Sequence, residues 1–408
     1  MFPELFCQEQ CHEIKNRKLE NQYDEAIKKL SYSEREALNI LLRILEEEPG
    51  YYPAQYVLAD HYYHKASDIL ASKNYAEYRN LETYYLRAEK HFKRVTEICP
   101  SYDDYTSFFR LGSFYYSIKE YEKAEKMLKT FCDKNKESLR HQNEAKKKLE
   151  NINTYKKLIE DPVAFDPVAI QGICTQADEF LPLISPDGEY AFFTRRYRKK
   201  EKNDLVSKMV EEFSYSKKIR TTEAGNPVFG EGRPMPSPFN DGRNQGGVAI
   251  SIDNNHLYIT ICEFKQVDKK PYKNCDIYYS KRKNNGWTKP ENLGPNINLP
   301  DSWEGQPTIS ADGRSLFFAS NRKGGYGGMD IYVSHLSENR IWTPAINIGD
   351  TINTSGDEKS PFLHSDSRTL YFSSNGIFGM GGFDIFFSKL NDQGKWTKPQ
   401  NIGYPINT

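Results

Sequence analysis

The sequence lacks an excess of charge of either sign, and it lacks a long apolar run. It contains 56 Lys and Arg residues against 56 Asp and Glu residues. A neutral chain has no overall field that would draw it to nucleic acid or to an anionic membrane surface. No stretch approaches the roughly 18–20 consecutive apolar residues that a membrane-spanning helix needs. We therefore expect neither a nucleic-acid-binding protein nor a transmembrane segment.

Short chemical motifs are also missing. The 7 cysteines include no Cys-x-x-Cys pair, and their odd number disfavours a zinc site or a full disulfide framework. There is no Gly-x-Ser-x-Gly elbow, phosphate-binding loop, Rossmann fingerprint or His-Glu-x-x-His motif. His61 and His64 follow Asp60 on an expected helix, but no clear third ligand stands nearby, so we interpret them as packing or exposed residues. We predict no catalytic residue, no metal site and no cofactor, and hence that the chain is not an enzyme.

The first half of the chain has the periodicity of helices. From residue 16 to residue 160, apolar residues recur at spacings of three and four, as on amphipathic helices, and Pro49-Gly50 and Pro100 interrupt the pattern. It resembles the tetratricopeptide (TPR) repeat, in which paired helices approach closely. We expect a TPR-like helical domain over residues 16–160 after an N-terminal segment of residues 1–15, with a plain helical bundle as the alternative. The positions that match the repeat are Leu111, Gly112, Tyr115 and Ala124.

The second half consists of short apolar runs separated by Gly, Pro, Asn and Asp. Four segments resemble one another, each with a polar turn such as Ser-x-Asp-Gly before an apolar run. Each is followed by a second run, such as DIYYS, DIYVS or DIFFS, and the last three then have a Trp-containing segment. An inner run, two longer runs and an outer run make four antiparallel strands, which is one propeller blade, and stacked blades bury one another's faces. The segments begin at Ser185, Ser251, Ser310 and His364.

The glycine-rich stretch SNRKGGYGGMDIYVS of the third repeat could hold a phosphate or calcium, or could only turn the chain. The second repeat has CEFKQVDKKPYKNC in the same place, without a glycine. We therefore predict a hairpin turn, for which glycine supplies positive φ angles. The Asp residues of the following motif, Asp276, Asp330 and Asp384, are predicted to accept hydrogen bonds in these turns.

The S-x-D-G turn, the apolar run, S-N-R, the glycine hairpin and D-I-Y together resemble the WD40-like propeller repeat (PD40) of TolB-type proteins. We expect an α + β multidomain chain with a WD40-like β-propeller over residues 163–408, in four complete blades that belong to a five-bladed ring. The blades are expected at about 178–235, 244–295, 304–349 and 358–403, with residues 163–171 as a closing strand.

TPR-like helices before such a propeller resemble the OmpA-family proteins of the periplasm and outer membrane, among them a peptidoglycan-anchored component of the type IX secretion system. This resemblance implies a periplasmic, outer-membrane-associated scaffold that binds proteins through the TPR groove and the propeller rim. Peptidoglycan would be bound only through an OmpA-like domain outside this chain, and a secretory leader would precede it. The alternative is a TolB-like sensor or enzyme that binds a peptide or sugar in the channel. Convergent carboxylates with His or Tyr in the channel would favour that alternative, whereas a plugged apolar channel would favour the scaffold.

Several residues are candidates for sites, each with a structural alternative. An acidic or amide residue six positions before each turn could line the channel mouth, or could bind backbone amides of the loop between blades. Four tyrosines could line the TPR groove, or could only pack. The basic run 195–202 could contact a partner, or could be a solvated loop. The channel-mouth candidates are Glu179, Gln245, Glu304 and Glu358, and the groove candidates are Tyr62, Tyr63, Tyr115 and Tyr116.

Two cysteines flank the hairpin of the second repeat. Alignment of the repeats places Cys262 and Cys275 near opposite positions of paired strands, within reach of a disulfide. In an oxidising compartment they would form one, and otherwise they would be free thiols. Cys7 and Cys11 lie one helical turn apart and indicate no chemistry.

Overall fold

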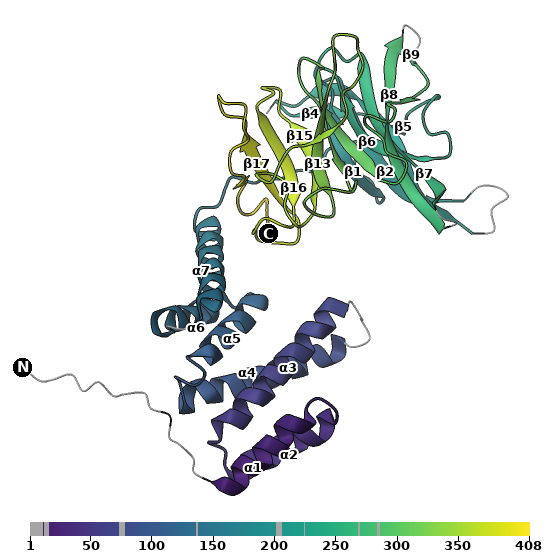
Figure 1. The fold of residues 1–408 in the computed structure, drawn as a ribbon. Helices are drawn as coiled ribbons and strands as arrows, with labels where there is room; N and C mark the ends of the chain where they lie inside the picture. The colour runs from purple at the N-terminus through teal and green to yellow at the C-terminus, as the bar shows by residue number, and fades with distance from the viewer. Residues whose placement is uncertain are drawn as a thin grey trace, which may run out of the picture. The chain divides into compact units, whose positions relative to one another are not determined.

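The chain folds into two compact units, Met1–Lys157 and Leu158–Thr408. The structure is a computed structural model that describes Cys11 and residues 16–72, 78–135, 138–200, 206–223, 225–267, 270–283 and 286–408. Helices make up the first unit and strands the second (Figure 1). This confirms the predicted fold class of a helical domain followed by a β-propeller.

The described part of the helical unit contains seven helices, and consecutive helices pack as pairs, α1 with α2, α3 with α4 and α5 with α6. One core joins the pairs, and Phe92, Phe114 and Phe131 are fully buried in it. None of the described helices is long and apolar enough to cross a membrane. The helices are α1 (Arg17–Lys29), α2 (Glu34–Glu47), α3 (Tyr52–Ser72), α4 (Tyr78–Ile98), α5 (Thr106–Ser117), α6 (Tyr121–Lys134) and α7 (Leu139–Glu160).

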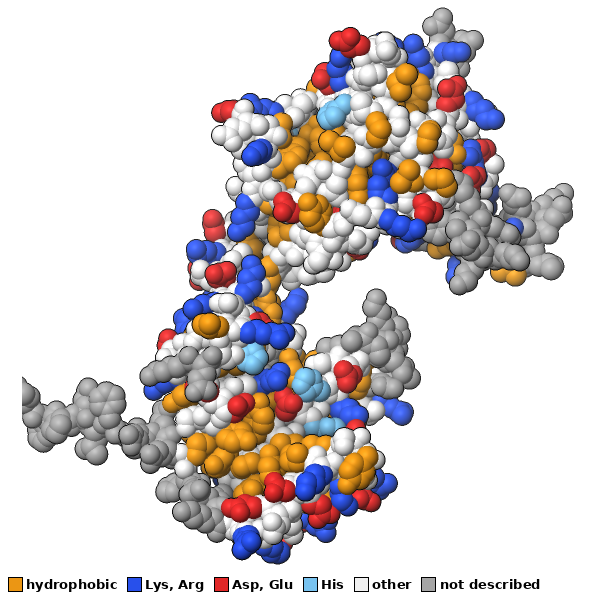
Figure 2. Space-filling view, in the orientation of Figure 1, with side chains coloured by type: hydrophobic (Ala, Val, Ile, Leu, Met, Phe, Trp, Pro, Cys, Tyr) orange, Lys and Arg blue, Asp and Glu red, His pale blue; other side chains and the backbone are white. Residues whose placement is uncertain are grey.

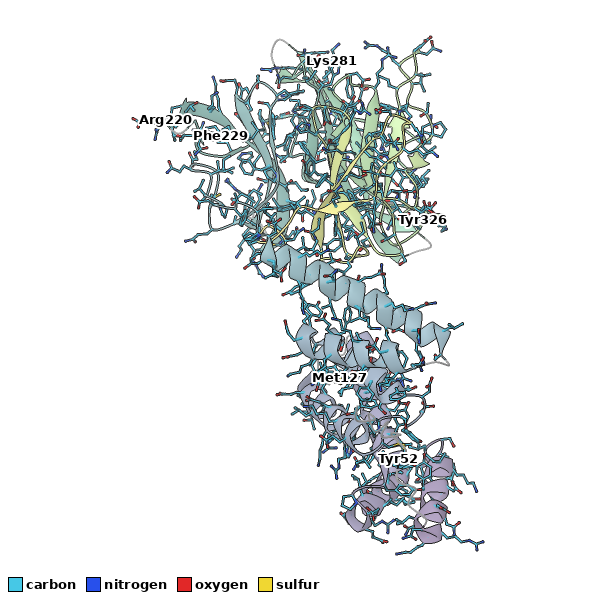
Figure 3. All side chains as sticks on the ribbon, turned by 90° about the vertical axis from the view of Figure 1, so that its left-hand side faces the viewer. Tyr52, Met127, Arg220, Phe229, Lys281 and Tyr326 are labelled. Atoms are coloured by element: carbon cyan, nitrogen blue, oxygen red, sulfur yellow. A yellow bond between two sulfur atoms is a disulfide. The ribbon has the colours of Figure 1, made fainter. Side chains whose placement is uncertain are left out.

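The long interval between the two predicted helical repeats is explained by helix length. The α3 and α4 helices each have 21 residues, so most of the residues around 66–87 extend these two helices. Tyr52, at the start of α3 (labelled in Figure 3), packs edge-on against Tyr102 with ring centroids 5.0 Å apart. The described part of the insertion therefore lengthens this pair of helices.

Gly112 allows α5 and α6 to approach closely, and we predict that Gly112→Ala destabilises the helical unit. A Cβ atom at Gly112 would lie 2.8 Å from Leu128 Cγ and 3.2 Å from the Leu128 backbone N. Overpacking of a core in this way typically costs about 1–3 kcal/mol. The measurement is urea unfolding followed by helical circular dichroism. Lys126→Ala, on the exposed face of α6, is the control, and an equal effect of both changes would contradict the argument.

Four antiparallel sheets form the propeller unit, and we call them blades one to four in chain order. In the first two blades an extra strand pairs with an extension of the third strand. Blade one contains β1 (Asp178–Ile184), β2 (Tyr190–Lys199), β3 (Lys208–Thr221), β4 (Pro227–Phe229) and β5 (Arg233–Pro234); blade two contains β6 (Asn244–Ile250), β7 (His256–Val267), β8 (Lys270–Lys283), β9 (Gly286–Trp287) and β10 (Glu291–Asn292); blade three contains β11 (Glu304–Ile309), β12 (Ser315–Ser320), β13 (Asp330–His335) and β14 (Ile346–Asn347); blade four contains β15 (Glu358–Leu363), β16 (Thr369–Ser374), β17 (Asp384–Lys389) and β18 (Gln400–Asn401).

Alternating side chains of each blade pack against the neighbouring blade, which produces separate apolar cores between blades one and two, two and three, and three and four. A tryptophan near the outer edge of one blade contacts an aromatic ring of the preceding blade. Trp342 lies 6.1 Å from Tyr258, and Trp396 lies 6.1 Å from Phe317, both edge-on. The Trp-containing segment of the repeat therefore joins neighbouring blades.

The two ends of the blade series differ in how they are covered. Ile173 and Phe229 (labelled in Figure 3) pack over the outer face of blade one. Residues 163–171, predicted as a closing strand, are not in a strand, although Val163 N donates to Tyr404 O at 2.7 Å. On blade four, Ile385 is 39% exposed, whereas its equivalent Ile331 in blade three is fully buried. The described residues form four blades, and the fifth blade stays a prediction.

Candidate functional site: the propeller channel

The inner strands β1, β6, β11 and β15 are edge strands of their sheets, and all four contribute to a cavity of about 560 Å³. A pocket of this size is within the usual range for ligand sites. Because each blade begins with its inner strand, the segment just before each polar turn reaches this cavity. The channel is therefore the place where residues from all four repeats meet.

Every inner strand has an irregularity at the same position. The pairing register shifts in each, and the residue at the shift has a positive φ: 51° at Leu181, 56° at Gly247, 54° at Gln306 and 50° at Ser360. Proline follows three of these residues. Bulges and prolines prevent a free strand edge from pairing with another strand. A partner in the channel would thus be held by side-chain contacts and not by an added strand.

Hydrogen bonds join these bulges from one blade to the next. Gly247 N donates to Thr194 Oγ1 of blade one at 3.1 Å, and Gln306 N donates to Thr260 Oγ1 of blade two at 3.0 Å. Blade three has Ala319 where blades one and two have threonine, and there Ser360 N donates to Gln306 Oε1 at 2.8 Å. The backbone N–H groups of these three bulge residues are therefore satisfied within the wall of the channel.

The lining of the channel cavity contains no Asp, Glu, Lys or Arg, although 27% of the chain is charged. Ile184, Ile252 and Phe362 are 46%, 57% and 49% exposed. In the view of Figure 2, hydrophobic side chains are exposed on the propeller unit between groups of charged ones. Apolar side chains exposed together in a cavity are typical of a binding site. His364 is the one titratable residue in this lining.

A smaller cavity of about 240 Å³ shares Leu181, Gly247 and Gln306 with the larger one. It is also lined by Trp303 and by the disulfide between Cys262 and Cys275. The bulge residues therefore lie between the two cavities.

The four predicted channel-mouth residues do not line the larger cavity, and all of them bind the loop between blades. Glu179 and Glu358 accept hydrogen bonds from the backbone and hydroxyl of Thr175 and Thr354, respectively. Gln245 accepts from Asn240 N at 2.9 Å and borders the smaller cavity. These are the contacts expected if the side chains bind the loop between blades, which was the alternative to a role at the channel mouth.

Of the four residues, Glu304 accepts the most hydrogen bonds. It is fully buried and accepts hydrogen bonds from Leu299 N (3.1 Å), Ser320 Oγ (2.8 Å) and Arg322 Nη2 (3.2 Å). Burial raises the pKa of Glu304 in spite of these donors. At Glu179, burial also raises the pKa, but the donors of Thr175 and Arg195 outweigh it and hold the pKa below its ordinary value.

The glycine-rich stretch of blade three is a turn between β12 and β13, as the repeats indicated. Asp330 accepts hydrogen bonds from Tyr326 N (2.6 Å; Tyr326 is labelled in Figure 3) and Gly327 N (3.2 Å). Asp384 accepts from Met380 N and Gly381 N in the same way, whereas Asp276 accepts from two asparagine side chains. Among the described residues, no group of His, Cys, Asp and Glu side chains could hold a metal ion.

The predicted groove tyrosines of the helical unit are largely packed inside it. Tyr62 and Tyr115 are buried, and the Tyr115 hydroxyl donates to Glu89 Oε1 at 2.8 Å. Tyr63 and Tyr116 are half-buried, and Asn151 Nδ2 donates to the Tyr116 hydroxyl at 2.8 Å. His61 and His64 each lie near one carboxylate, at 3.7 and 3.4 Å.

The basic run of blade one is mostly paired. Arg195 Nε donates to Glu179 at 2.8 Å, Arg196 pairs with Asp178, and Lys199 pairs with Glu212. Residues 201 and 202 lie outside the described residues. The run thus forms ion pairs within the β2–β3 hairpin and with the first inner strand, β1.

The structure contains two disulfides among its described cysteines. Cys262 and Cys275 are directly opposite on β7 and β8, with Cα atoms 4.0 Å apart, and are bonded. Cys11 is bonded to Cys99, which follows α4 and is fully buried. Sequence reasoning missed this second bond, because a separation of 88 residues gives no local signal. Cys7 lies outside the described residues.

No protein-family model matches the chain, and no curated protein matches it. Solved structures do match the propeller. They include a TolB protein from Agrobacterium tumefaciens (18% identity, 56% of this chain and 81% of that one, TM-score 0.30). They also include a puromycin-hydrolysing peptidase from Mycobacterium tuberculosis (12%, 56% and 39%, TM-score 0.30) and an α-L-arabinofuranosidase from Lactobacillus brevis (12%, 57% and 76%, TM-score 0.33). The chain spans well under half of the peptidase. At these identities the likeness concerns the fold and assigns no activity.

These comparisons correct one prediction. From missing catalytic motifs we predicted that the chain is not an enzyme, yet the matching propellers include a peptidase and a glycosidase. A propeller of this kind therefore does not separate enzymes from binding proteins. The absence of short motifs fails as a criterion because residues of different blades can meet without being close in sequence.

Proposed function

We propose that the chain is a protein-binding scaffold of the cell envelope, and that its propeller channel takes an uncharged, apolar segment of a partner protein. The observation that carries this proposal is the channel lining, which has exposed Ile184, Ile252 and Phe362 and no Asp, Glu, Lys or Arg. Binding an apolar segment there would bury side chains that are now in contact with water.

The same lining bears on the alternative of a channel sensor or enzyme. That function calls for carboxylates that converge with His or Tyr in the channel. The predicted carboxylates Glu179, Glu304 and Glu358 bind loop groups instead, and none of them lines the larger cavity. The channel thus favours recognition of apolar side chains.

An oxidising compartment is proposed from the two disulfides, since such bonds persist mainly outside the reducing cytosol. Together with the resemblance to OmpA-family proteins, this supports a periplasmic, outer-membrane-associated role. The machine served would be the type IX secretion or gliding apparatus, with attachment to peptidoglycan through an OmpA-like domain outside these residues. The helical unit, resembling TPR repeats, would offer a second surface for protein partners.

Charge placed in the channel is expected to abolish partner binding without unfolding the protein. Ile184→Glu and Phe362→Glu introduce carboxylates from blades one and four at side chains that are already exposed. A carboxylate against an apolar segment would lose its hydration without gaining a partner. In a display screen of random linear peptides, the wild type should enrich uncharged apolar sequences, and both variants should lose them by at least about tenfold in affinity.

Ile219→Glu is the matched control, because Ile219 is 66% exposed on β3 and is not part of the channel lining. It should bind the selected peptides as the wild type does. Enrichment of charged peptides, or retention of binding by both channel variants, would rule out the proposed function.

A further inference from the structure

Two equivalent grooves lie at the boundaries between blades and border the channel cavity. One, of about 690 Å³, lies between blades two and three, and the other, of about 650 Å³, lies between blades three and four. Both are bounded by a polar turn of the repeat and by the tryptophan that joins the blades. Their similar volumes show that stacking of the sheets creates such a groove, so volume alone indicates no function.

The side chains of the two grooves differ at equivalent positions. The strand registers identify these positions, and at four of them the groove between blades two and three has the residue with more hydrogen-bonding capacity. At a fifth position it has the aromatic ring of His256 in place of Ser315. The four pairs, with the groove between blades two and three first, are Tyr258 and Phe317, Tyr279 and Val333, Glu291 and Ile346, and Arg340 and Gly394.

The aromatic residues of this groove form an ordered wall. His256 stacks on Tyr279 with ring centroids 5.7 Å apart and planes 20° apart, and its Nδ1 lies 2.6 Å from the Tyr279 hydroxyl. Tyr258 packs against the edge of Trp342 and lies 5.6 Å from Tyr279. The rings thus hold one another in place before any ligand is bound, which lowers the entropic cost of binding.

Arg340 occupies a backbone position that normally calls for glycine. Its φ is 59°, and the equivalent residue of blade four is Gly394, with a φ of 70°. A side chain in this left-handed region is uncommon and costs backbone strain, which occurs most often at functional sites. Arg340 is exposed at the lip of the groove, near His256 and Tyr279, whose pKa values its charge influences. An arginine at this position places an exposed cation at the lip of the groove.

The charges around the groove indicate a neutral ligand. Arg314 and Arg340 line the same cavity as four carboxylates, so an anion or a cation would meet its own charge. The carboxylates are those of Asp253, Glu291, Asp312 and Glu338. Hydroxyl groups both donate and accept hydrogen bonds and suit such a mixed set. The apolar face of a sugar ring suits the half-buried rings of His256 and Tyr279, which the buried Tyr258 and Trp342 support from behind. We propose that the groove between blades two and three binds a neutral glycan. The groove shares Ile252 and Ala311 with the channel lining, but its proposed ligand differs from the protein segment proposed for the channel.

The test uses the full chain on an array of neutral oligosaccharides, followed by calorimetry with cellotetraose and the N-acetylglucosamine tetramer as defined probes. We expect at least one neutral glycan to bind with a dissociation constant of about 1 mM or tighter. Arg340→Gly and Tyr279→Val convert the groove to the residues of its counterpart and should each weaken binding by about tenfold or more. Because glycine suits the backbone at residue 340, Arg340→Gly should keep or raise the melting temperature while it loses binding.

Lys395→Ala, in the groove between blades three and four, is the matched control and should bind as the wild type does. Failure of every neutral glycan to bind, or full binding by Arg340→Gly, overturns the proposal. Selective binding of charged glycans or of linear peptides in this groove overturns it as well. Loss of the channel function in Ile184→Glu leaves these readouts unchanged, since Ile184 is not part of the groove lining.

Discussion

Replacement of Glu304 by alanine is expected to destabilise the propeller unit by about 3–5 kcal/mol, the usual cost of stranding one partner of a buried ion pair. Arg322, the cation of this pair, has a side chain only 9% exposed. It also donates to Ile297 O at 2.7 Å and lies over the rings of Phe318 and Tyr332. These contacts would keep the guanidinium buried after its carboxylate is removed.

The measurement is urea unfolding followed by tryptophan fluorescence, which reports on the propeller unit alone. Every tryptophan of the chain lies in that unit, while helical circular dichroism reports on the helical unit within the same sample. Only the fluorescence transition should move. The tryptophans are Trp287, Trp303, Trp342 and Trp396.

Glu358→Ala is the matched control, because Glu358 is equally buried and holds the same kind of loop. Its partners are the backbone and hydroxyl of Thr354 and the hydroxyl of Ser374, and Gly376 stands where blade three has Arg322. Loss of these neutral hydrogen bonds should cost about 1–3 kcal/mol. Removing the cation as well, in Glu304→Ala with Arg322→Ala, should recover part of the larger loss, as expected for coupled residues. A cost for Glu304→Ala no greater than that for Glu358→Ala would show that the ion pair is not decisive.

The propeller could be predicted because its signal is repeated locally. The turn that begins at Ser310 has a counterpart in every blade, the Asp330 motif recurs in blades two, three and four, and each precedes or begins a strand. An acidic or amide residue recurs at the position of Glu304, and we considered that it could bind the loop between blades. The hydrogen bonds that Glu304 accepts from Leu299 N and Ser302 Oγ are of that kind. The bulges at Leu181 and Gln306 were not predicted, because positive φ at a residue other than glycine has no composition signal.

The groove between blades two and three was missed for a different reason. His256 and Arg340 are far apart in sequence and become neighbours only when blade three stacks on blade two. A signal was nevertheless present in the repeats, since Arg340 stands where blade four has glycine before Lys-Trp. Comparing the repeats for departures from their consensus, and not only for agreement, would have identified this position. The Cys11–Cys99 disulfide had no comparable signal.

Loss of the Cys11–Cys99 disulfide is expected to destabilise the helical unit by about 4 kcal/mol, because the bond closes a long loop in the unfolded chain. The two cysteines are 88 residues apart, so the loop includes α1, α2, α3 and α4. The Cys262–Cys275 bond closes a loop of only 13 residues of separation, and its removal should cost about 3 kcal/mol in the propeller unit. Circular dichroism measures the effect of losing the Cys11–Cys99 bond on the helical unit, and tryptophan fluorescence measures the effect of losing the Cys262–Cys275 bond on the propeller unit.

The variants Cys11→Ala, Cys99→Ala and the double variant form a cycle that distinguishes a bond from simple packing. If the cysteines are bonded, the double variant should cost little more than Cys11→Ala alone, since either change removes the same constraint. Reduction of the wild type should lower its helical transition to that of Cys11→Ala and leave the helical transition of the variant unchanged. Additive effects, or a wild type indifferent to reductant, would contradict the bond. They would also remove half of the support for an oxidising compartment, because a thiol pair that stays reduced fits the cytosol as well as the envelope.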